Sequence, residues 1–214
     1  MVKVLLTGFD PFAGESVNPS LEAIKALDGE QIGDAQIIGR SLPVVFGESI
    51  DVLKKYLDEI KPDIVIGVGQ AGGRSAISVE KVAINLSDGR IPDNSGKQPV
   101  DEPINPDGPV AYWSGLPVKA IAKKVQEAGI PAEVSHTAGT YVCNHIFYGL
   151  MDLLSEREAV RGGFIHIPFI PEQAVRHPGQ PSLALSDIVK AVRIAIDTTL
   201  QNEQDIAEIG GTIS

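Results

Sequence analysis

Short apolar runs alternate along the chain with longer amphipathic segments. Residues 2–6 and 63–68 are dominated by aliphatic and β-branched side chains, a composition typical of buried strands. Residues 19–27 and 49–60 instead space their apolar side chains three and four positions apart, which predicts two amphipathic helices. Asn18 directly precedes a proline at the start of the first of these helices, so it is a good candidate for the N-cap.

The alternation continues to the end of the chain. It predicts extended segments at residues 36–46, 131–136 and 164–169, and a further one at residues 76–86 that is either two strands or one long bent strand. It predicts helices at residues 116–128, 141–154 and 186–200, the last with Ser186 as a candidate cap. Residues 87–109 contain five prolines and three glycines, too many for a helix or a central strand. Loops of this length are usually lids, binding loops or disordered segments, and the sequence does not decide between covering a site and supporting subunit contacts.

Strands that alternate with helices predict an α/β fold, with a mostly parallel or mixed sheet covered on both faces. The chain has 214 residues and 43% hydrophobic residues, enough for a large core. It has no internal repeat, no low-complexity tract and no shift in composition that would mark a second domain. We therefore expect one domain over residues 1–214.

The charge and the cysteine count exclude several classes of partner. The net charge of −10 disfavours nucleic acid and anionic membranes. No apolar run approaches the roughly 20 residues that span a bilayer, and the N-terminus does not look like a signal peptide. A single cysteine rules out an intramolecular disulfide framework and fits a cytoplasmic location, and the four histidines lack the paired spacing of metal ligands.

Two glycine-containing turns follow predicted strands. Residues 67–72 match the dinucleotide fingerprint G-x-G-x-x-G, but a strand-like segment follows where pyrophosphate binding needs a helix to begin. We expect a turn at a strand's carboxyl end, a position that often lines a ligand pocket. Residues 7–14 lack the Gly-Lys-Ser/Thr ending of a phosphate loop. Their two phenylalanines, Phe9 and Phe12, either fill the core or form an apolar slot for a flat ligand.

Cys143 is the only thiol in the chain. A lone cysteine is usually an inert buried residue. This one, however, follows a glycine turn with Thr140 as a possible cap, and it falls in the first turn of a predicted helix. Backbone N–H groups and the helix dipole there stabilise a thiolate, lower the pKa of the thiol and can donate to an oxyanion. The sequence therefore favours Cys143 as a nucleophile.

A thiol nucleophile needs a base, and His166 is the best candidate. It lies inside an otherwise apolar strand, where an imidazole without a partner costs about 1–3 kcal/mol. His145 is two residues from the cysteine on the same predicted helix and points to another face. His177 lies in a proline-flanked loop, where we expect it to be solvated, and His136 stays possible as a base, a cap or a core residue.

The base in turn needs a group that orients it. Glu80 has the same period-2 parity as Val82, Ile84 and Leu86, so an ideal strand turns this carboxylate inward. An inward carboxylate next to His166 would raise the basicity of the imidazole and select its tautomer. A surface carboxylate is the alternative, because a β-bulge would reverse the parity.

Three motifs resemble the pyroglutamyl peptidase (pyrrolidone-carboxylate peptidase) family of cysteine peptidases. They are Leu-Leu-Thr-Gly-Phe-Asp-Pro-Phe at residues 5–12, Gly-Thr-Tyr-Val-Cys-Asn-His at residues 139–145 and Phe-Ile-His-Ile-Pro-Phe at residues 164–169. The resemblance covers nearly the whole chain. It implies a Cys143–His166–Glu80 triad that hydrolyses the amide bond after an N-terminal pyroglutamyl residue through a thioester. It also implies a twisted, mostly parallel mixed sheet of the phosphorylase/hydrolase type, no metal or organic cofactor, a cytoplasmic location and a homotetramer.

The resemblance also implies a substrate pocket. Its lining falls on Phe9, Phe12, Asn18, Gln70, Ile91, Tyr141 and Val142, with Arg90 close to the catalytic group. Aromatic walls suit a flat, uncharged lactam, and an amide such as that of Gln70 suits its polar edge. Tyr141 stands where phenylalanine is expected and Ala13 where glycine is common.

Two other functions remain as alternatives. A nucleoside phosphorylase or hydrolase fits the α/β pattern and the turn at residues 67–72, and it would tolerate the loss of Cys143. A non-catalytic protein that binds a small molecule would keep Cys143 and His166 as core residues with an unreactive thiol. The fold class by itself does not decide between these functions.

Overall fold

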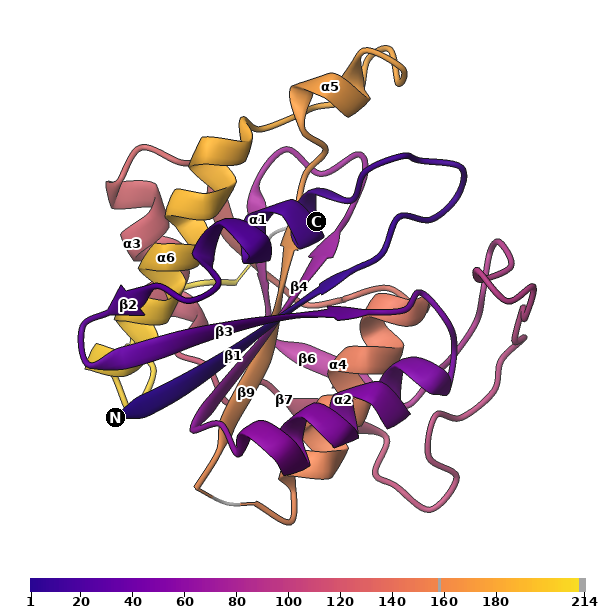
Figure 1. Ribbon diagram of the computed structural model, residues 1–214, viewed down its shortest axis with the longest axis horizontal. Coiled ribbons are helices and arrows are strands. Elements are labelled where there is room, and N and C mark those ends of the chain that lie inside the picture. The colour runs from indigo at the N-terminus through magenta and orange to yellow at the C-terminus, as the bar shows by residue number, and fades with distance from the viewer. Residues whose placement is uncertain (158, 212–214) are drawn as a thin grey trace.

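The computed structural model describes residues 1–157 and 159–211 (Figure 1). Residues 158 and 212–214 of the predicted domain lie outside this part. Within it, seven strands form one sheet in the order β2-β3-β1-β4-β9-β5-β8. Their bounds are β1 Val2–Phe9, β2 Gln31–Ile32, β3 Ala35–Leu42, β4 Ile64–Gln70, β5 Ile77–Glu80, β8 Ala132–Ser135 and β9 Arg161–Ile167.

The sheet is mixed and mostly parallel. Strand β1 pairs in parallel with β3 and β4, β4 with β9, and β5 with β8. Only the pairs β2–β3 and β5–β9 are antiparallel among the described strands of this sheet. The predicted α/β fold is therefore confirmed.

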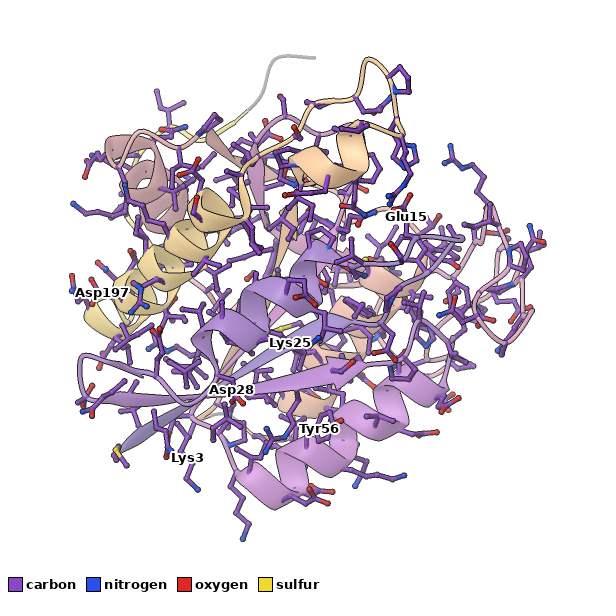
Figure 2. The ribbon with its side chains drawn as sticks, turned by 45° about the horizontal axis from the view of Figure 1, so that its top comes forward. Lys3, Glu15, Lys25, Asp28, Tyr56 and Asp197 are labelled. Carbon is purple, nitrogen blue, oxygen red and sulfur yellow. The ribbon has the colours of Figure 1, made fainter. Side chains whose placement is uncertain are left out.

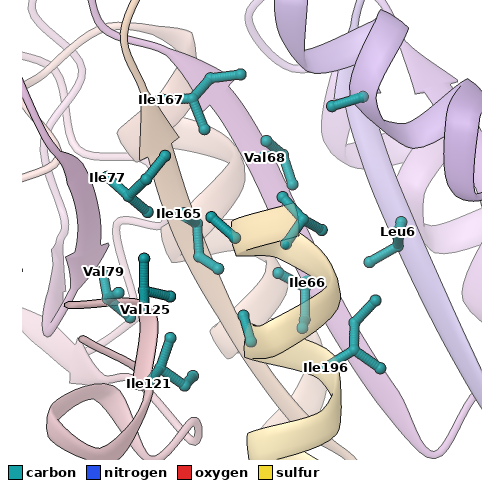
Figure 3. Packing of buried hydrophobic residues seen from close by; sticks show 14 of the residues in the cluster. Leu6, Ile66, Val68, Ile77, Val79, Ile121, Val125, Ile165, Ile167 and Ile196 are labelled. Atoms are coloured by element: carbon teal, nitrogen blue, oxygen red, sulfur yellow. The ribbon is translucent and has the colours of Figure 1, made fainter. Parts of the chain in front are cut away.

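Helices cover both faces of the sheet (Figure 1). The bounds of the helices are α1 Pro19–Leu27, α2 Glu48–Ile60, α3 Val118–Glu127, α4 Val142–Leu154, α5 Pro171–Ala174 and α6 Leu185–Gln201. On the face covered by α1, α3 and α6, Ile66 and Ile165 of the central strands pack with Ile121 of α3 and Ile196 of α6 (Figure 3). On the face covered by α2 and α4, Phe164 of β9 packs in a second cluster with α4 side chains. Both faces of the central strands are buried under helices, which explains their continuous apolar sequences.

Helix α1 begins where the sequence predicts. Asn18 is its N-cap, and the Asn18 Oδ1 atom accepts hydrogen bonds from the backbone N–H of Ser20 at 3.1 Å and from its hydroxyl at 2.8 Å. The Asn18 amide also donates to the carbonyl of Asp10 at 3.1 Å. A side chain at Gly8 would place its Cβ 2.7 Å from the Ser20 carbonyl, so the helix lies directly against β1. These contacts place the intervening loop over the carboxyl end of β1.

The extended segment predicted at residues 76–86 is two strands in two different sheets. Strand β5 ends at Glu80, and β6 (Val82–Ile84) pairs antiparallel with β7 (Ala111–Trp113) in a separate two-stranded sheet. In β6 the buried side chain is that of Ala83. The period-2 parity does not continue across Lys81, because the chain changes sheets there.

Some local predictions were wrong. The N-cap of α6 is Ala184 instead of Ser186, and the N-cap of α4 is Tyr141 instead of Thr140. The Thr140 hydroxyl instead donates to the carbonyl of Asp88 at 2.8 Å. The short elements β2, β7 and α5 were not predicted, because two to four residues carry too little periodicity.

Residues 87–109 contain no helix and no strand longer than one bridge in the described chain, in line with their proline content. The segment is nevertheless anchored at several points. The backbone N–H of Asp88 donates to the Thr140 carbonyl at 2.9 Å, and that of Asn94 to the Val44 carbonyl at 3.0 Å. The Asn94 side chain also donates to the Pro11 carbonyl at 3.0 Å. The loop therefore joins the segments that lead into α2 and α4 to the loop after β1.

None of the helices in the described ranges has both the length and the apolarity that crossing a membrane requires.

Candidate active site

Three neighbouring strands bring the candidate residues onto one face of the sheet. In the β4–β9 pair Gly69 is opposite His166, and in the β5–β9 pair Glu80 is opposite Phe164. Residues paired across strands point to the same face, as do residues two apart along one strand. The side chains of Glu80, Phe164 and His166 therefore point toward the face that α4 covers.

Glu80 and His166 are in direct contact. The His166 Nδ1 atom lies 2.7 Å from the Glu80 Oε1 atom, and both side chains are buried. The prediction that Glu80 points inward is confirmed. The argument from parity with Val82 and Ile84 was wrong, because those residues belong to another sheet. Glu80 points inward because β5 pairs with β9.

Arg74, in the turn between β4 and β5, is a further partner of the carboxylate that the sequence did not indicate. Its Nη1 atom lies 2.6 Å from the Glu80 Oε1 atom, and its Nη2 atom donates to the Thr137 carbonyl at 2.8 Å. The Glu80 Oε2 atom is buried without a hydrogen-bond partner among the described residues. A buried carboxylate needs compensating charge, and only the folded chain shows that Arg74 supplies it.

The pair has shifted pKa values. Burial raises the pKa of the Glu80 carboxyl, but the hydrogen bond from His166 and the charge of Arg74 outweigh it, so the pKa lies below its ordinary value. Burial lowers the pKa of His166, and Glu80 offsets only part of this effect. The expected increase in basicity from Glu80 is present, but desolvation is larger. The imidazole is therefore neutral at neutral pH.

Cys143 is the second residue of α4, in the first turn as predicted. Its sulfur lies over β4, where a Cβ atom added to Gly69 would be 2.9 Å from Sγ. Gly69 is also the strand partner of His166, so the thiol and the imidazole lie over adjacent strands. The backbone N–H groups of Val142, Cys143 and Asn144 precede the first intrahelical bond, from the His145 N–H to the Tyr141 carbonyl. These N–H groups therefore have no partner within the helix and lie in the same turn as Cys143.

The thiol is neutral in this structure. Burial, with a smaller contribution from the charge of Glu80, raises the pKa of Cys143 to about 12. The prediction that the helix N-terminus lowers this pKa is therefore wrong for the unliganded protein. Burial and the charge of Glu80 outweigh the opposing charge of Arg74.

A small cavity lies beside the sulfur. Its lining contains most of the predicted pocket residues: Phe9, Phe12, Asn18, Gln70, Tyr141 and Val142, together with Val44 and Cys143. The rings of Phe12 and Tyr141 lie with centroids 6.3 Å apart, and Phe46 meets Tyr141 edge-on at 5.3 Å. The two phenylalanines have different surroundings, since Phe9 is a core residue and Phe12 is only partly buried.

A wider groove of about 500 Å³ adjoins this cavity and shares Phe12 and Gln70 with it. Arg90 and Ile91 line this groove and are exposed. The structure thus places these two predicted residues next to the cavity rather than inside it. Arg90 makes no hydrogen bond to Cys143 within the described part of the chain.

The two departures from the family pattern have different structural settings. The Tyr141 hydroxyl donates to the Pro92 carbonyl at 3.0 Å, so this residue ties the cavity wall to the loop at residues 87–109. Ala13 has a φ of 53°, in the left-handed region that favours glycine. Ala13 therefore adopts the conformation that a glycine at this position would take without strain.

His145 and His177 are engaged elsewhere, and His136 is exposed. The His145 Nε2 atom accepts from the Gly47 N–H at 2.9 Å, and its Nδ1 atom lies 2.9 Å from the Ser87 hydroxyl, so His145 points away from the sulfur as predicted. His177 stacks on Phe169 at 4.7 Å and bonds to Glu15 at 2.7 Å. The His177 side chain is still 37% exposed, so it is partly solvated as expected, but it is also held by these two contacts.

An α/β fold in which a cysteine lines a cavity, over the strand next to a buried imidazole–carboxylate pair, has the features of a cysteine hydrolase. The model of the pyroglutamyl peptidase family matches residues 2–202. Pyrrolidone-carboxylate peptidases of Bacillus thuringiensis and Cupriavidus taiwanensis are both 58% identical to this chain. The first alignment covers 99% of each chain and the second 100%.

Solved structures agree with the sequence comparison. The crystal structure of pyroglutamyl peptidase I from Bacillus amyloliquefaciens is 56% identical, with a TM-score of 0.94 over 96% of this chain and 100% of the other. A mutant pyrrolidone carboxyl peptidase from Pyrococcus furiosus is 50% identical, with a TM-score of 0.91 over 94% and 99%. The chain belongs to the pyroglutamyl peptidase family of cysteine peptidases. Neither a nucleoside phosphorylase nor a non-catalytic binding protein is supported.

Proposed function

We propose that this protein removes an N-terminal pyroglutamyl residue from peptides, with Cys143 as nucleophile, His166 as base and Glu80 as the group that orients the base. The observation that carries the assignment is the buried 2.7 Å contact between Glu80 and His166. His166 is paired with Gly69 on the neighbouring strand, and Gly69 lies under the Cys143 sulfur. A core histidine has no need of an ionised partner, and a core cysteine has no need of a helix N-terminus.

In the resting enzyme the Cys143 thiol and the His166 imidazole are both neutral, so the reaction begins with a proton transfer between them. Because the pKa of Cys143 is raised and that of His166 is lowered, the thiol keeps its proton until a substrate arrives. His166 Nε2 then takes the proton while Sγ attacks the pyroglutamyl carbonyl, and Glu80 on Nδ1 stabilises the imidazolium that forms. The N–H groups of the first turn of α4 donate to the oxyanion.

The second half of the reaction reverses the proton transfer. The imidazolium gives its proton to the leaving amine, the peptide departs and a thioester remains on Cys143. His166 next removes a proton from a water molecule that attacks the thioester. Collapse of this intermediate releases pyroglutamate and returns the proton to the sulfur.

The cavity fits the acyl group by chemistry. The lactam ring of a pyroglutamyl residue is nearly flat and uncharged, which suits walls from Phe9, Phe12 and Tyr141. The cavity contributes the Gln70 amide to the polar edge of the ring, and no carboxylate lies in its described lining to hold a free α-amine. Arg90 and Ile91, in the adjoining groove, are on the side where the rest of the peptide leaves.

Further features of the proposal rest on the family. We propose that residues 1–214 form one catalytic domain that acts without a metal or organic cofactor. We also propose a homotetramer located in the cytoplasm, with no nucleic acid or membrane partner. The chain's single cysteine and net charge of −10 support these proposals.

Release of a fluorescent amine from a pyroglutamyl amide tests the function. We expect turnover by the wild type, and its loss after complete alkylation of the protein, because Cys143 is the only possible thiol target. Cys143→Ser should lower kcat by at least about a thousandfold while the melting temperature stays near that of the wild type. Substantial residual turnover by Cys143→Ser would rule out the thiol nucleophile.

A further inference from the structure

Gln173, on the short helix α5, is fully buried and contacts the amide of Gln70. The Gln173 Nε2 atom lies 2.9 Å from the Gln70 Oε1 atom. Gln70 lines both the cavity beside Cys143 and the adjoining groove. A residue 103 positions away in sequence therefore touches the one side-chain amide that both hollows share.

The orientation of the Gln173 amide is determined by neighbouring groups that can act only as hydrogen-bond donors or only as acceptors. Its Oε1 atom accepts from the backbone N–H of Ile170 at 3.3 Å, a group that can only donate. Its Nε2 atom lies 3.3 Å from the Val17 carbonyl and 3.5 Å from the Glu15 carboxylate, groups that can only accept, and its two hydrogens are shared among these two acceptors and Gln70. A flipped amide would place oxygen against two acceptors and NH₂ against a donor.

The fixed Gln173 amide in turn orients Gln70. Because Gln173 presents NH₂, the Gln70 side chain must present its oxygen to it. The Gln70 NH₂ group has no hydrogen-bond partner among the described residues, and Gln70 lies where the cavity and the groove meet. A ligand that occupies this junction therefore meets an N–H donor of Gln70 and not an acceptor.

We propose that Gln173 is a positioning residue for substrate specificity, and that through it Gln70 donates a hydrogen bond to the ring carbonyl of the pyroglutamyl group. This inference rests on the proposed function. A lactam ring has both a carbonyl acceptor and an N–H donor, and the orientation of Gln70 selects the carbonyl. A pyrrolidine ring has no such carbonyl, so it would leave the Gln70 donor unpaired and be rejected.

The surroundings hold Gln173 in place. Glu15 lies beside α5 (Figure 2) and is bound by Arg176 at 2.5 Å and by His177 at 2.7 Å. Hydrogen bonds from His177, Arg176 and Gln173 lower the pKa of Glu15 even though burial opposes them. The carboxylate that accepts from Gln173 therefore stays ionised at neutral pH and cannot become a donor.

A double-mutant cycle tests the proposal. We expect Gln173→Leu to lower kcat/KM for a pyroglutamyl amide by about tenfold or more, mainly by raising KM. In the Gln70→Ala background the same change should cost less than about twofold, because its effect passes through Gln70. An equal loss in both backgrounds would overturn the proposal, since it would mean that Gln173 only supports the fold, and so would no loss from Gln173→Leu alone.

Two further variants separate orientation from packing. Gln173→Glu keeps the shape but presents oxygen, so Gln70 must turn, and we expect a loss at least as large as that of Gln173→Leu. Gln126→Leu is the matched control, because the Gln126 amide donates to the Ala132 carbonyl far from the cavity, at 2.6 Å. It should leave kcat/KM unchanged. Wild-type activity of Gln173→Glu would also overturn the proposal.

A binding assay separates this proposal from the proposed function. Protection by 2-pyrrolidone of Cys143 against alkylation measures lactam binding without turnover. Pyrrolidine lacks the carbonyl but is also a cation at neutral pH, so the deciding comparison is between the wild type and Gln173→Leu. We expect protection by 2-pyrrolidone only, and about tenfold weaker protection in Gln173→Leu. Equal protection of the wild type and the variant would refute the role of Gln173. A wild type that binds 2-pyrrolidone but does not cleave the amide would refute the proposed function alone.

Discussion

At the scale of single residues, the balance between burial and charge at Glu80 decides the state of the site. Glu80 stays ionised because His166 and Arg74 both approach one of its oxygens, at 2.7 and 2.6 Å. The same burial keeps the imidazole and the thiol neutral, because neither has enough compensating charge. The carboxylate is therefore the one permanent charge of the candidate triad, and it is placed where the imidazolium forms.

The pH dependence of Glu80→Gln tests this balance. His166 must be neutral to act as a base, and since its pKa lies below 6.5 we expect the wild-type kcat/KM to fall only below that pH. Glu80 raises the pKa of His166, so the glutamine variant should move this acid limb to lower pH and lower the plateau by about tenfold or more. Profiles of kcat/KM from about pH 4 to 8 measure both effects. An acid limb at the wild-type position would remove Glu80 from the mechanism.

At the scale of elements, the close approach of α4 to β4 brings the thiol to the histidine strand. This approach depends on a missing side chain. A Cβ atom on Gly69 would lie 2.9 Å from the Cys143 sulfur and 2.8 Å from the Phe164 ring. Neither neighbour is a flexible chain end, because one is held by the helix and the other by the core. Gly67 and Gly69 of β4 and Gly72 after it thus allow close packing against Phe164 and Phe169, and they do not form a dinucleotide site.

Substitution of Gly69 by alanine should therefore damage activity and stability together. We expect kcat/KM to fall by about tenfold or more as the sulfur moves off β4, and the free energy of unfolding to fall by about 1–3 kcal/mol through overpacking. Gly211→Ala is the control, because none of the described residues has an atom within 4 Å of its added Cβ atom. Kinetics and urea unfolding give the two quantities. Wild-type kinetics in Gly69→Ala would show that the sulfur does not depend on this contact.

At the scale of the whole molecule, His145 connects parts that are far apart in sequence. It joins α4 to Gly47 at the start of α2 and to Ser87 at the start of the long loop. The imidazole is buried, and burial with a smaller effect of the Lys97 charge lowers its pKa from 6.5 to about 4. Since its Nε2 atom accepts from a backbone N–H, only the neutral ring fits this junction.

Acid should therefore destabilise the fold through His145. Above pH 6.5 the ring is neutral in both states. As the pH falls toward 4 the unfolded chain binds a proton that the folded one does not, so stability falls with pH, by about 3 kcal/mol in total. His145→Gln removes this titration and should flatten the dependence between pH 6.5 and 4, as measured by urea unfolding. His166 contributes in the same direction and stays in both proteins. Parallel pH curves would contradict the prediction.

Much of the fold and part of the candidate site could be predicted from the sequence alone, because they depend on neighbours along the chain. Apolar periodicity predicted the main strands and helices, and Asn18 before a proline predicted the start of α1. Cys143 in the first turn of a helix and His166 in an apolar strand are local features too. The family resemblance rests on the same kind of contiguous motif.

Only the tertiary structure decided what depends on distant parts of the chain. It joined Glu80 to His166, 86 positions away, and Gln173 to Gln70, 103 positions away, and it added Arg74 to the carboxylate. It also reversed the expected shift of the Cys143 pKa, because the helix end is a local property whereas the loss of water is a sum over everything packed around the sulfur. Periodicity predicts which side of a helix or strand is buried, but only the fold determines which side chains that side contacts.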